Sequence, residues 1–132
     1  MNVAHVPLAV SLGDPAGIGP ELIAEAWFRR EDERLLPFFA IGGAGILDAA
    51  ARQRGISVPV VAISDVSEAA AAFAHGLPVL GAMDADYRPG EPDEQGAHLA
   101  IASLTQASAL TIAGAAAAIV TGPIAKSHLA RY

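Results

Sequence analysis

The amino-acid sequence predicts an α/β fold, with a mostly parallel sheet and helices on both of its faces. Short apolar runs of strand length recur along the chain, and segments long enough for a helix separate them. Glycine and proline cluster where several of these runs end, as they do where a strand turns into a helix. Strands that alternate with helices are joined as βαβ units, whose strands lie parallel.

The first apolar run, residues 6–12, predicts a strand covered on both faces because it is continuous rather than alternating. A helix is expected from Pro20, since proline suits the first helical position and Glu21 complements the positive end of the helix dipole. Its apolar residues lie at helical spacing: Leu22, Ile23, Ala26 and Trp27. The charged run 29–34 ends this helix.

The same alternation continues through the middle of the chain. The run LLPFFAIGG predicts a second strand, and residues 46–54 predict a helix that ends at Gly55. The run VPVVAIS predicts a third strand. A short helix over residues 66–74 and a strand in GLPVLGA are expected next.

The last third of the sequence predicts one long helix between two strands. A loop rich in Asp, Pro and Gly covers residues 83–93. The helix should run from Asp93 to about Gly114, with a packing face at three-and-four spacing. That face consists of Ala97, Ile101, Leu104 and Ser108. The run AAAIV then predicts a strand, and Pro123 the start of a last helix.

The composition argues against several classes of protein. The chain has 132 residues, the size of one ordinary domain. Its mean hydropathy is +0.42, yet no apolar stretch reaches the roughly 20 residues of a membrane-spanning helix. A net charge of -6 with a single lysine offers no basic face to a nucleic acid. Without cysteine or a recognisable leader, the expected compartment is the cytoplasm, with no membrane or nucleic-acid partner.

Two strand-to-helix junctions share one construction and form the candidate site. GIGPE follows the first strand and VTGPIAK follows the last, and both place Gly-Pro at a helix start. Because parallel strands end at one sheet edge, both helix N-termini should point free N–H groups at that edge, where such folds bind ligands. The residues expected to bind substrate or cofactor are Asp14, Gly17, Gly19, Thr121 and Lys126.

Each of these residues has a functional and a simpler structural interpretation. Asp14 precedes Pro15, which favours extended backbone, so its carboxylate could accept from a ribose or substrate hydroxyl. The two glycines would permit positive φ or a close approach of ligand to backbone. Lys126 could hold a phosphate or carboxylate, or assist proton transfer. Alternatively, the glycines only make a tight turn, Asp14 and Thr121 cap helices, and Lys126 is a solvated surface residue.

The loop SLGDPAGIGPE matches neither common nucleotide-binding motif. It lacks the Gly-Lys-Ser/Thr of a Walker A loop, and its spacing is G-x-x-x-G-x-G rather than G-x-G-x-x-G. The turn at Gly42, Gly43 and Gly45, with Asp65 about twenty residues further on, could be a degenerate dinucleotide fingerprint. A plain βαβ turn also explains those glycines.

The sequence predicts no metal site in this chain. The four histidines lack metal-ligand spacing such as H-E-x-x-H; they are His5, His75, His98 and His128. Asp84 and Asp86 lie in a polar loop and are expected to form turns rather than a pair of catalytic carboxylates.

Four stretches of the sequence occur in the order GDPAGIGPE, FFAIGGAGILDAAARQRG, GEPDEQGAHLAIASL and AAIVTGPIAKSHL. Together they resemble the N-terminal part of the 4-hydroxythreonine-4-phosphate dehydrogenase family of pyridoxal phosphate biosynthesis, and the first and last stretches are the specific ones. The resemblance implies a fold like that of isocitrate and isopropylmalate dehydrogenases, in homodimers of two-domain chains. It also implies that NAD oxidises a small phosphorylated hydroxy amino acid, that a divalent metal (Zn, Mg or Co) polarises the alcohol, and that the 3-keto acid product decarboxylates.

The resemblance also sets limits on what this chain can do. Ala125 stands where family members usually carry Asn or His, and family chains are much longer. We therefore expect residues 1–132 to form the N-terminal part of the first α/β domain of a truncated fold, without the second domain, the C-terminal part or the metal ligands. Such a fragment would have no turnover alone and would expose a sheet edge and apolar helix faces.

Two other functions are compatible with the sequence. One is a free-standing α/β module that binds a nucleotide or phosphate without chemistry, and the other is a family member that acts on another hydroxy acid or diol.

Overall fold

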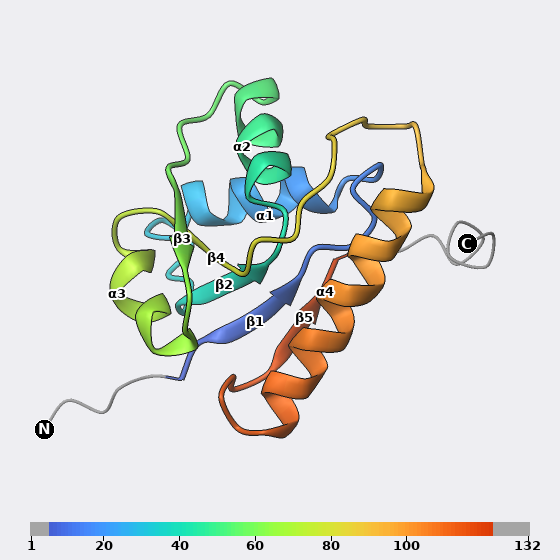
Figure 1. Ribbon diagram of the computed structural model, residues 1–132. Coiled ribbons are helices and arrows are strands. Elements are labelled where there is room, and N and C mark those ends of the chain that lie inside the picture. The colour runs from blue at the N-terminus through green and yellow to red at the C-terminus, as the bar shows by residue number, and fades with distance from the viewer. Residues whose placement is uncertain (1–5, 123–132) are drawn as a thin grey trace, which may run out of the picture.

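The computed structural model describes residues 6–122, which form a five-stranded sheet in the order β3-β4-β2-β1-β5 (Figure 1). Its strands are β1 (Leu8–Ser11), β2 (Phe38–Ile41), β3 (Val60–Ile63), β4 (Leu77–Leu80) and β5 (Ile119–Thr121). The helices are α1 (Gly19–Phe28), α2 (Ala44–Gln53), α3 (Ala69–Phe73) and α4 (Glu94–Ile112), with a 3-10 turn η1 (Val66–Glu68) before α3. Each described pair of neighbouring strands is parallel, which confirms the predicted class.

The direction in which the chain crosses the sheet decides which face each helix covers. From β1 through β2 to β3 the chain moves toward one edge, and α1 and α2 pack together on one face (Figure 1). From β3 through β4 to β5 it returns, and α4 lies on the opposite face. Strand-helix-strand crossovers are right-handed, so reversing the direction of travel moves the helix to the other face.

The core has one layer on each side of the sheet. Phe38 and Ala40 of β2 belong to the layer that includes α1 and α2, whereas Phe39 and Ile41 belong to the layer that includes α4. Successive strand residues point to opposite faces, and here both faces are buried. This explains why β2 is a continuous apolar run in the sequence rather than an alternating one.

The packing face of α4 differs from the predicted one. Its buried residues are Gly96, Ala97, Leu99, Ala100, Ser103 and Ala107. Of the predicted face only Ala97 is buried, and Ile101 is exposed. The contact face consists mostly of small side chains, which let the helix lie close to the sheet, so large apolar residues were a misleading guide to its orientation.

The first helix agrees with the prediction except in its details. It begins at Gly19, with Pro20 as its second residue, and it buries Ile23 and Trp27 while Leu22 stays exposed. The indole Nε1 of Trp27 donates to the backbone oxygen of Phe73 at 2.9 Å, which joins the end of α1 to the end of α3. The helix predicted from Pro123 lies outside the described residues. Within residues 6–122, no helix combines the length and apolarity needed to cross a membrane.

Candidate functional site at the carboxyl edge of β1 and β5

The two predicted junctions leave neighbouring strands at the same edge of the sheet. β1 pairs directly with β5, with Ser11 opposite Thr121 (Figure 1). The backbone N–H of Gly122 donates to the Ser11 oxygen at 3.0 Å and continues the ladder beyond β5. The structure therefore brings the loop after β1 and the start of the segment after β5 together, as the sequence predicts.

Gly122 is in direct contact with the first junction. A Cβ atom at this position would lie 2.7 Å from the Leu12 carbonyl oxygen and 2.9 Å from the Gly13 nitrogen. Both neighbours are backbone atoms, so they cannot move aside as a flexible side chain can. A glycine is therefore required at position 122 for the backbone after β5 to approach the backbone after β1 this closely.

Asp14 shapes the loop after β1 rather than capping the helix that follows. Its Oδ1 atom accepts a hydrogen bond from the Ala16 N–H at 2.9 Å, and its backbone oxygen accepts from the Gly17 N–H at 2.9 Å. The N-cap residue of α1 is Ile18, whose side chain makes no capping hydrogen bond. The helix-cap interpretation of Asp14 is therefore wrong.

The glycine that adopts the unusual backbone conformation is not one of those predicted. Gly13 has a φ of 74°, in the left-handed region, whereas no positive φ occurs at Gly17 or Gly19. A Cβ atom on Gly17 would lie 3.4 Å from the Asp14 oxygen, an ordinary contact distance. The turn itself therefore does not require glycine at position 17, and a role of Gly17 in close approach of a ligand remains a prediction.

A buried serine that the sequence analysis missed supports the base of this site. The Ser103 hydroxyl accepts from the Leu12 N–H at 2.9 Å and donates to the Ile41 oxygen at 2.8 Å. It thereby joins α4 to the ends of β1 and β2. In the sequence Ser103 is one of several hydroxyl residues on this helix, and the wrong choice of helix face concealed it.

The loop 83–93 forms a wall beside the first junction. The Gly90 N–H donates to the Ala16 oxygen at 2.7 Å, and the Tyr87 hydroxyl donates to Glu21 Oε1 at 3.1 Å. Burial raises the pKa of Tyr87 to about 12, with the hydrogen bond to Glu21 and its negative charge adding to the effect. The loop is thus fixed to the first turn of α1.

The second glycine turn, Gly42 to Gly45, is closed by the chain itself. The Gly43 N–H donates to the Met83 oxygen at 2.7 Å, and the Gly45 N–H donates to Asp84 Oδ2 at 2.8 Å. A Cβ atom on Gly45 would lie 2.7 Å from the same carboxylate oxygen. The anion at the N-terminus of α2 is therefore the protein's own Asp84.

Asp65 does not complete a dinucleotide fingerprint with that turn. Its carboxylate accepts from the Ser67 N–H at 2.9 Å and caps η1, while Glu68 accepts from the Asp65 N–H at 2.7 Å. The hydrogen bonds from Ser67 lower the pKa of Asp65, and those from the Asp65 and Ser64 backbones lower the pKa of Glu68. Because β4 lies between β2 and β3, Asp65 is also two strands away from the turn, so the fingerprint hypothesis is wrong.

The remaining candidates occupy different environments. Thr121 is exposed at the end of β5, while Lys126 lies outside the described residues. His98 is exposed on α4, 3.9 Å from Glu94, and Asp86 pairs with Arg88 at 3.1 Å. Among residues 6–122, no group of three or more His, Cys, Asp or Glu side chains is placed to hold a metal ion.

Together, the parallel sheet and the glycine loop at its carboxyl edge define an α/β domain of the kind that binds ligands where strands turn into helices. A family model described as pyridoxal phosphate biosynthetic protein PdxA matches residues 34–132, and the chain belongs to this family.

Individual relatives extend this match over nearly the whole chain. A 4-hydroxythreonine-4-phosphate dehydrogenase of Erythrobacter litoralis is 50% identical over 98% of this chain and 38% of its own length. The enzyme of that name from Zymomonas mobilis is 46% identical over 93% of this chain and 36% of its own. The crystal structure of 4-hydroxythreonine-4-phosphate dehydrogenase from Klebsiella pneumoniae superposes with a TM-score of 0.76 at 29% identity, covering 96% of this chain and 40% of that one. The chain thus spans about two fifths of the length of these relatives.

Proposed function

We propose that this chain supplies the N-terminal part of the first α/β domain of a 4-hydroxythreonine-4-phosphate dehydrogenase. In this proposal the complete enzyme uses NAD and a divalent metal to oxidise the phosphorylated hydroxy amino acid, and the 3-keto acid formed then decarboxylates. The observation that carries the proposal is the pairing of β1 with β5, which joins the two motifs of the resemblance at one edge. The names of the relatives support the choice of substrate.

The described residues would bind and orient rather than react. The N-terminus of α1 carries partial positive charge, so the N–H groups of Gly19 and Glu21 suit a phosphate or pyrophosphate, whereas Pro20 between them has no N–H to donate. Asp14 fixes the shape of the loop through the Ala16 N–H. Thr121, exposed beside the loop, would donate a hydroxyl to the ligand, and Lys126 is the candidate cation.

The metal belongs to another part of the proposed enzyme. Because the described residues gather no ligand set for a metal, we assign no step through a metal to residues 6–122. In the proposal its ligands come from the parts of the relatives that this chain does not match. A homodimer of two-domain chains, as the resemblance implies, would complete the site.

A chimera tests the proposal. The matching segment of the Erythrobacter litoralis relative is replaced by this chain, and NADH formation is followed with 4-phosphohydroxythreonine and a divalent metal. We expect turnover in the chimera, none in the isolated chain, and a lower rate when Asp14 or Lys126 is changed to alanine. Asp48→Ala, on the outer surface of α2, is the matched control. A chimera that folds but does not turn over, while the relative does, overturns the proposal.

Two measurements separate the other candidate functions. Replacing the substrate by other hydroxy acids and diols in the same assay tests a changed specificity, which Ala125 favours because the family usually carries Asn or His there. Calorimetry of the isolated chain with NAD and with inorganic phosphate tests a free-standing binding module, which the α1 N-terminus favours. Tight saturable binding without turnover in the chimera would support the module.

A further inference from the structure

Glu21 is the third residue of α1, the position from which a glutamate side chain commonly reaches back to the N–H of the N-cap residue. The turn η1 shows that arrangement. Glu68, its third residue, accepts from the N–H groups of Ser64 and Asp65 at 2.8 and 2.7 Å. The carboxylate of Glu68 thereby covers the start of its own turn, whereas Glu21, at the equivalent position of α1, points elsewhere.

Both carboxylate oxygens of Glu21 accept hydrogen bonds from groups outside α1. Oε2 accepts from Arg54 Nη1 at 3.4 Å, and Oε1 accepts from the Tyr87 hydroxyl at 3.1 Å. Arg54, at the end of α2, also donates from Nη2 to Glu25 Oε2 at 2.8 Å. Glu21 and Glu25 are four residues apart on one side of α1, where like charges repel each other. The guanidinium of Arg54 bridges the two carboxylates and holds that of Glu21 on the α2 side.

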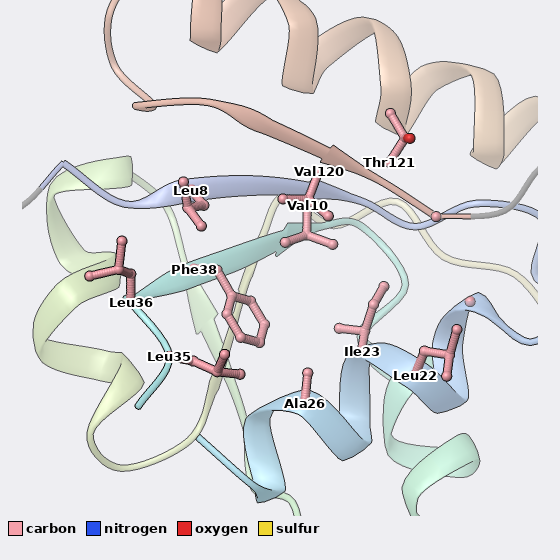
Figure 2. Close-up of a pocket in the computed structure, with 12 residues that line it drawn as sticks. Leu8, Val10, Leu22, Ile23, Ala26, Leu35, Leu36, Phe38, Val120 and Thr121 are labelled. Atoms are coloured by element: carbon pink, nitrogen blue, oxygen red, sulfur yellow. The ribbon is translucent and has the colours of Figure 1, made fainter. Parts of the chain in front are cut away.

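The side of α1 that faces the sheet offers Glu21 no polar partner. Ile23 and Ala26 point from this side toward an apolar groove whose floor includes Val10 and Phe38 (Figure 2). A carboxylate that entered the groove would lose its hydration without a hydrogen bond in return. Apart from open solvent, the polar positions within reach of Glu21 are thus the α2 side and the positive start of its own helix.

We propose that Arg54 is a positioning residue of the proposed ligand site, because it keeps the Glu21 carboxylate away from the N-terminus of α1. Without the guanidinium, repulsion from Glu25 and attraction to the helix dipole both favour a position like that of Glu68. Glu21 would then compete with a ligand phosphate for the N–H groups at the start of α1. The inference rests on the proposed function for the ligand, whereas the position of Glu21 can be measured in the chain alone.

The start of α2 shows what a carboxylate of the protein itself does at such a position. Asp84 Oδ2 accepts from the Gly45 N–H at 2.8 Å, so this helix N-terminus already holds an anion. In α1 the corresponding carboxylate is turned aside by Arg54 and Tyr87. The difference between the two helices thus depends on the partners that hold each acidic side chain.

The first test uses the full 132-residue chain without ligand and compares Arg54→Gln with Arg52→Gln. Arg52 pairs with Asp48 at 3.0 Å on the outer surface of α2, so its replacement removes the same charge without a contact to Glu21. Pairs between exposed side chains add little to the free energy of unfolding, so both variants should stay folded. We expect only Arg54→Gln to shift the amide resonances at the start of α1.

The titration of Tyr87 distinguishes a displaced Glu21 from one that stays in place. Burial, the hydrogen bond to Glu21 and the charge of Glu21 raise the pKa of Tyr87 from 10.0 to about 12, while the charge of Arg54 lowers it. Loss of the Arg54 charge alone would therefore raise this pKa further. If Glu21 turns to the helix start, the pKa falls toward 10 instead, and this fall is the result we expect for Arg54→Gln. Ring-carbon NMR of labelled tyrosine measures it.

The second test measures KM and kcat in the chimera with the Erythrobacter litoralis relative. Arg54→Gln should raise the KM of the ligand whose phosphate lies at α1 about fivefold and change kcat by less than about twofold, because binding rather than chemistry is affected. Adding Glu21→Gln removes the competing charge and should restore the original KM. A merely structural role of Arg54 would give no such rescue. Arg52→Gln should change neither constant.

Several results would contradict the inference. They are a Tyr87 pKa that does not fall in Arg54→Gln, an equal response to Arg52→Gln, an unchanged KM in Arg54→Gln, and a raised KM that Glu21→Gln does not restore. A chimera without turnover contradicts the proposed function instead. In that case the titration of Tyr87 still decides whether Arg54 holds Glu21 in place.

Discussion

The two glycine-rich turns of this protein follow adjacent parallel strands, yet among residues 6–122 a carboxylate from elsewhere in the chain occupies the helix N-terminus after only one of them. The loop called open here, residues 12–19, follows β1, and Ile18, the N-cap residue of its helix, makes no side-chain hydrogen bond. The closed loop, residues 42–45, follows β2 and receives the backbone of Met83 and the carboxylate of Asp84. Glycine content therefore does not identify a ligand loop, because what covers the helix N-terminus decides whether a ligand can reach it.

The segments that leave β2 and β4 run to opposite faces of the sheet, which explains why residues from elsewhere fill the space over the closed loop. The chain leaves β2 toward α2 on one face and leaves the neighbouring β4 toward α4 on the other. Such a divergence opens a crevice at the carboxyl edge, the usual ligand position in open α/β sheets. Here residues 83–84, which follow β4, fill that crevice.

The largest expected effect on stability is at the closed loop. Gly43 has a φ of 79°, and a Cβ atom there would lie 2.7 Å from Leu12 Cδ2 in the core. Gly43→Ala should lower the free energy of unfolding by about 3 kcal/mol, through left-handed strain and overpacking together. Denaturant unfolding followed by Trp27 fluorescence measures it.

Gly55→Ala is the matched control for that change. Gly55 has a φ of 71° with nothing within 4 Å of its Cβ position, so only strain of about 1 kcal/mol is expected. If both variants lost the same stability, the contact between the closed loop and Leu12 would have no energetic weight.

A smaller effect is expected where one side chain supports both loops. Ser103→Ala leaves the Leu12 N–H and the Ile41 oxygen buried without their partner. We expect a loss of about 2 kcal/mol in the free energy of unfolding, with larger amide shifts in both loops than elsewhere. Ser108→Ala, half-buried on the same helix, should change stability by less than about 0.5 kcal/mol. Shifts confined to α4 would contradict the bridging role.

Removing the hydrogen bond that holds the loop 83–93 against α1 should lower the free energy of unfolding by less than Ser103→Ala does. Tyr87→Phe removes the hydrogen bond to Glu21 and should lower stability by about 1 kcal/mol at neutral pH. The folded-state pKa of Tyr87 is raised from 10.0 to about 12, so this contribution is complete below pH 10 and is lost as the pH rises toward 12. Denaturant unfolding between pH 10 and 12 measures this loss of stability, and tyrosinate absorbance over the same pH range measures the pKa of Tyr87. An ordinary titration of both tyrosines of the wild-type chain near pH 10 would refute the bond.

The smallest effect on the free energy of unfolding is expected at the open loop. The largest effect on ligand affinity is expected there too. Gly17→Ala meets only an ordinary contact with the Asp14 oxygen, so unfolding should change by less than about 0.5 kcal/mol. If a ligand approaches the backbone here, its affinity should fall about tenfold, a change of about 1.4 kcal/mol. Calorimetry with NAD or phosphate on the chimera measures this. Gly43→Ala is the converse control, because it should weaken folding but not binding to folded molecules.

Much of the architecture could be predicted from local patterns. Each strand was visible as a short apolar run, and each N-terminal signal such as Pro20 or Asp93 acts within one turn of its helix. Once the strand order is known, the handedness of crossovers fixes the face of the sheet on which each connecting helix lies. The pairing of the two Gly-Pro junctions was predictable for the same reason, since parallel strands must end at one edge.

The sequence by itself thus determined the α/β class, the positions of the strands and helices among residues 6–122, and, through its motifs, the family. Tertiary structure alone decided which glycine loop is open, because Asp84 is 39 residues from Gly45 in the chain. It also decided that Ser103 rather than Ile101 faces the sheet. In both cases the deciding contact joins residues distant in sequence, and its strength depends on burial and geometry that no local pattern encodes.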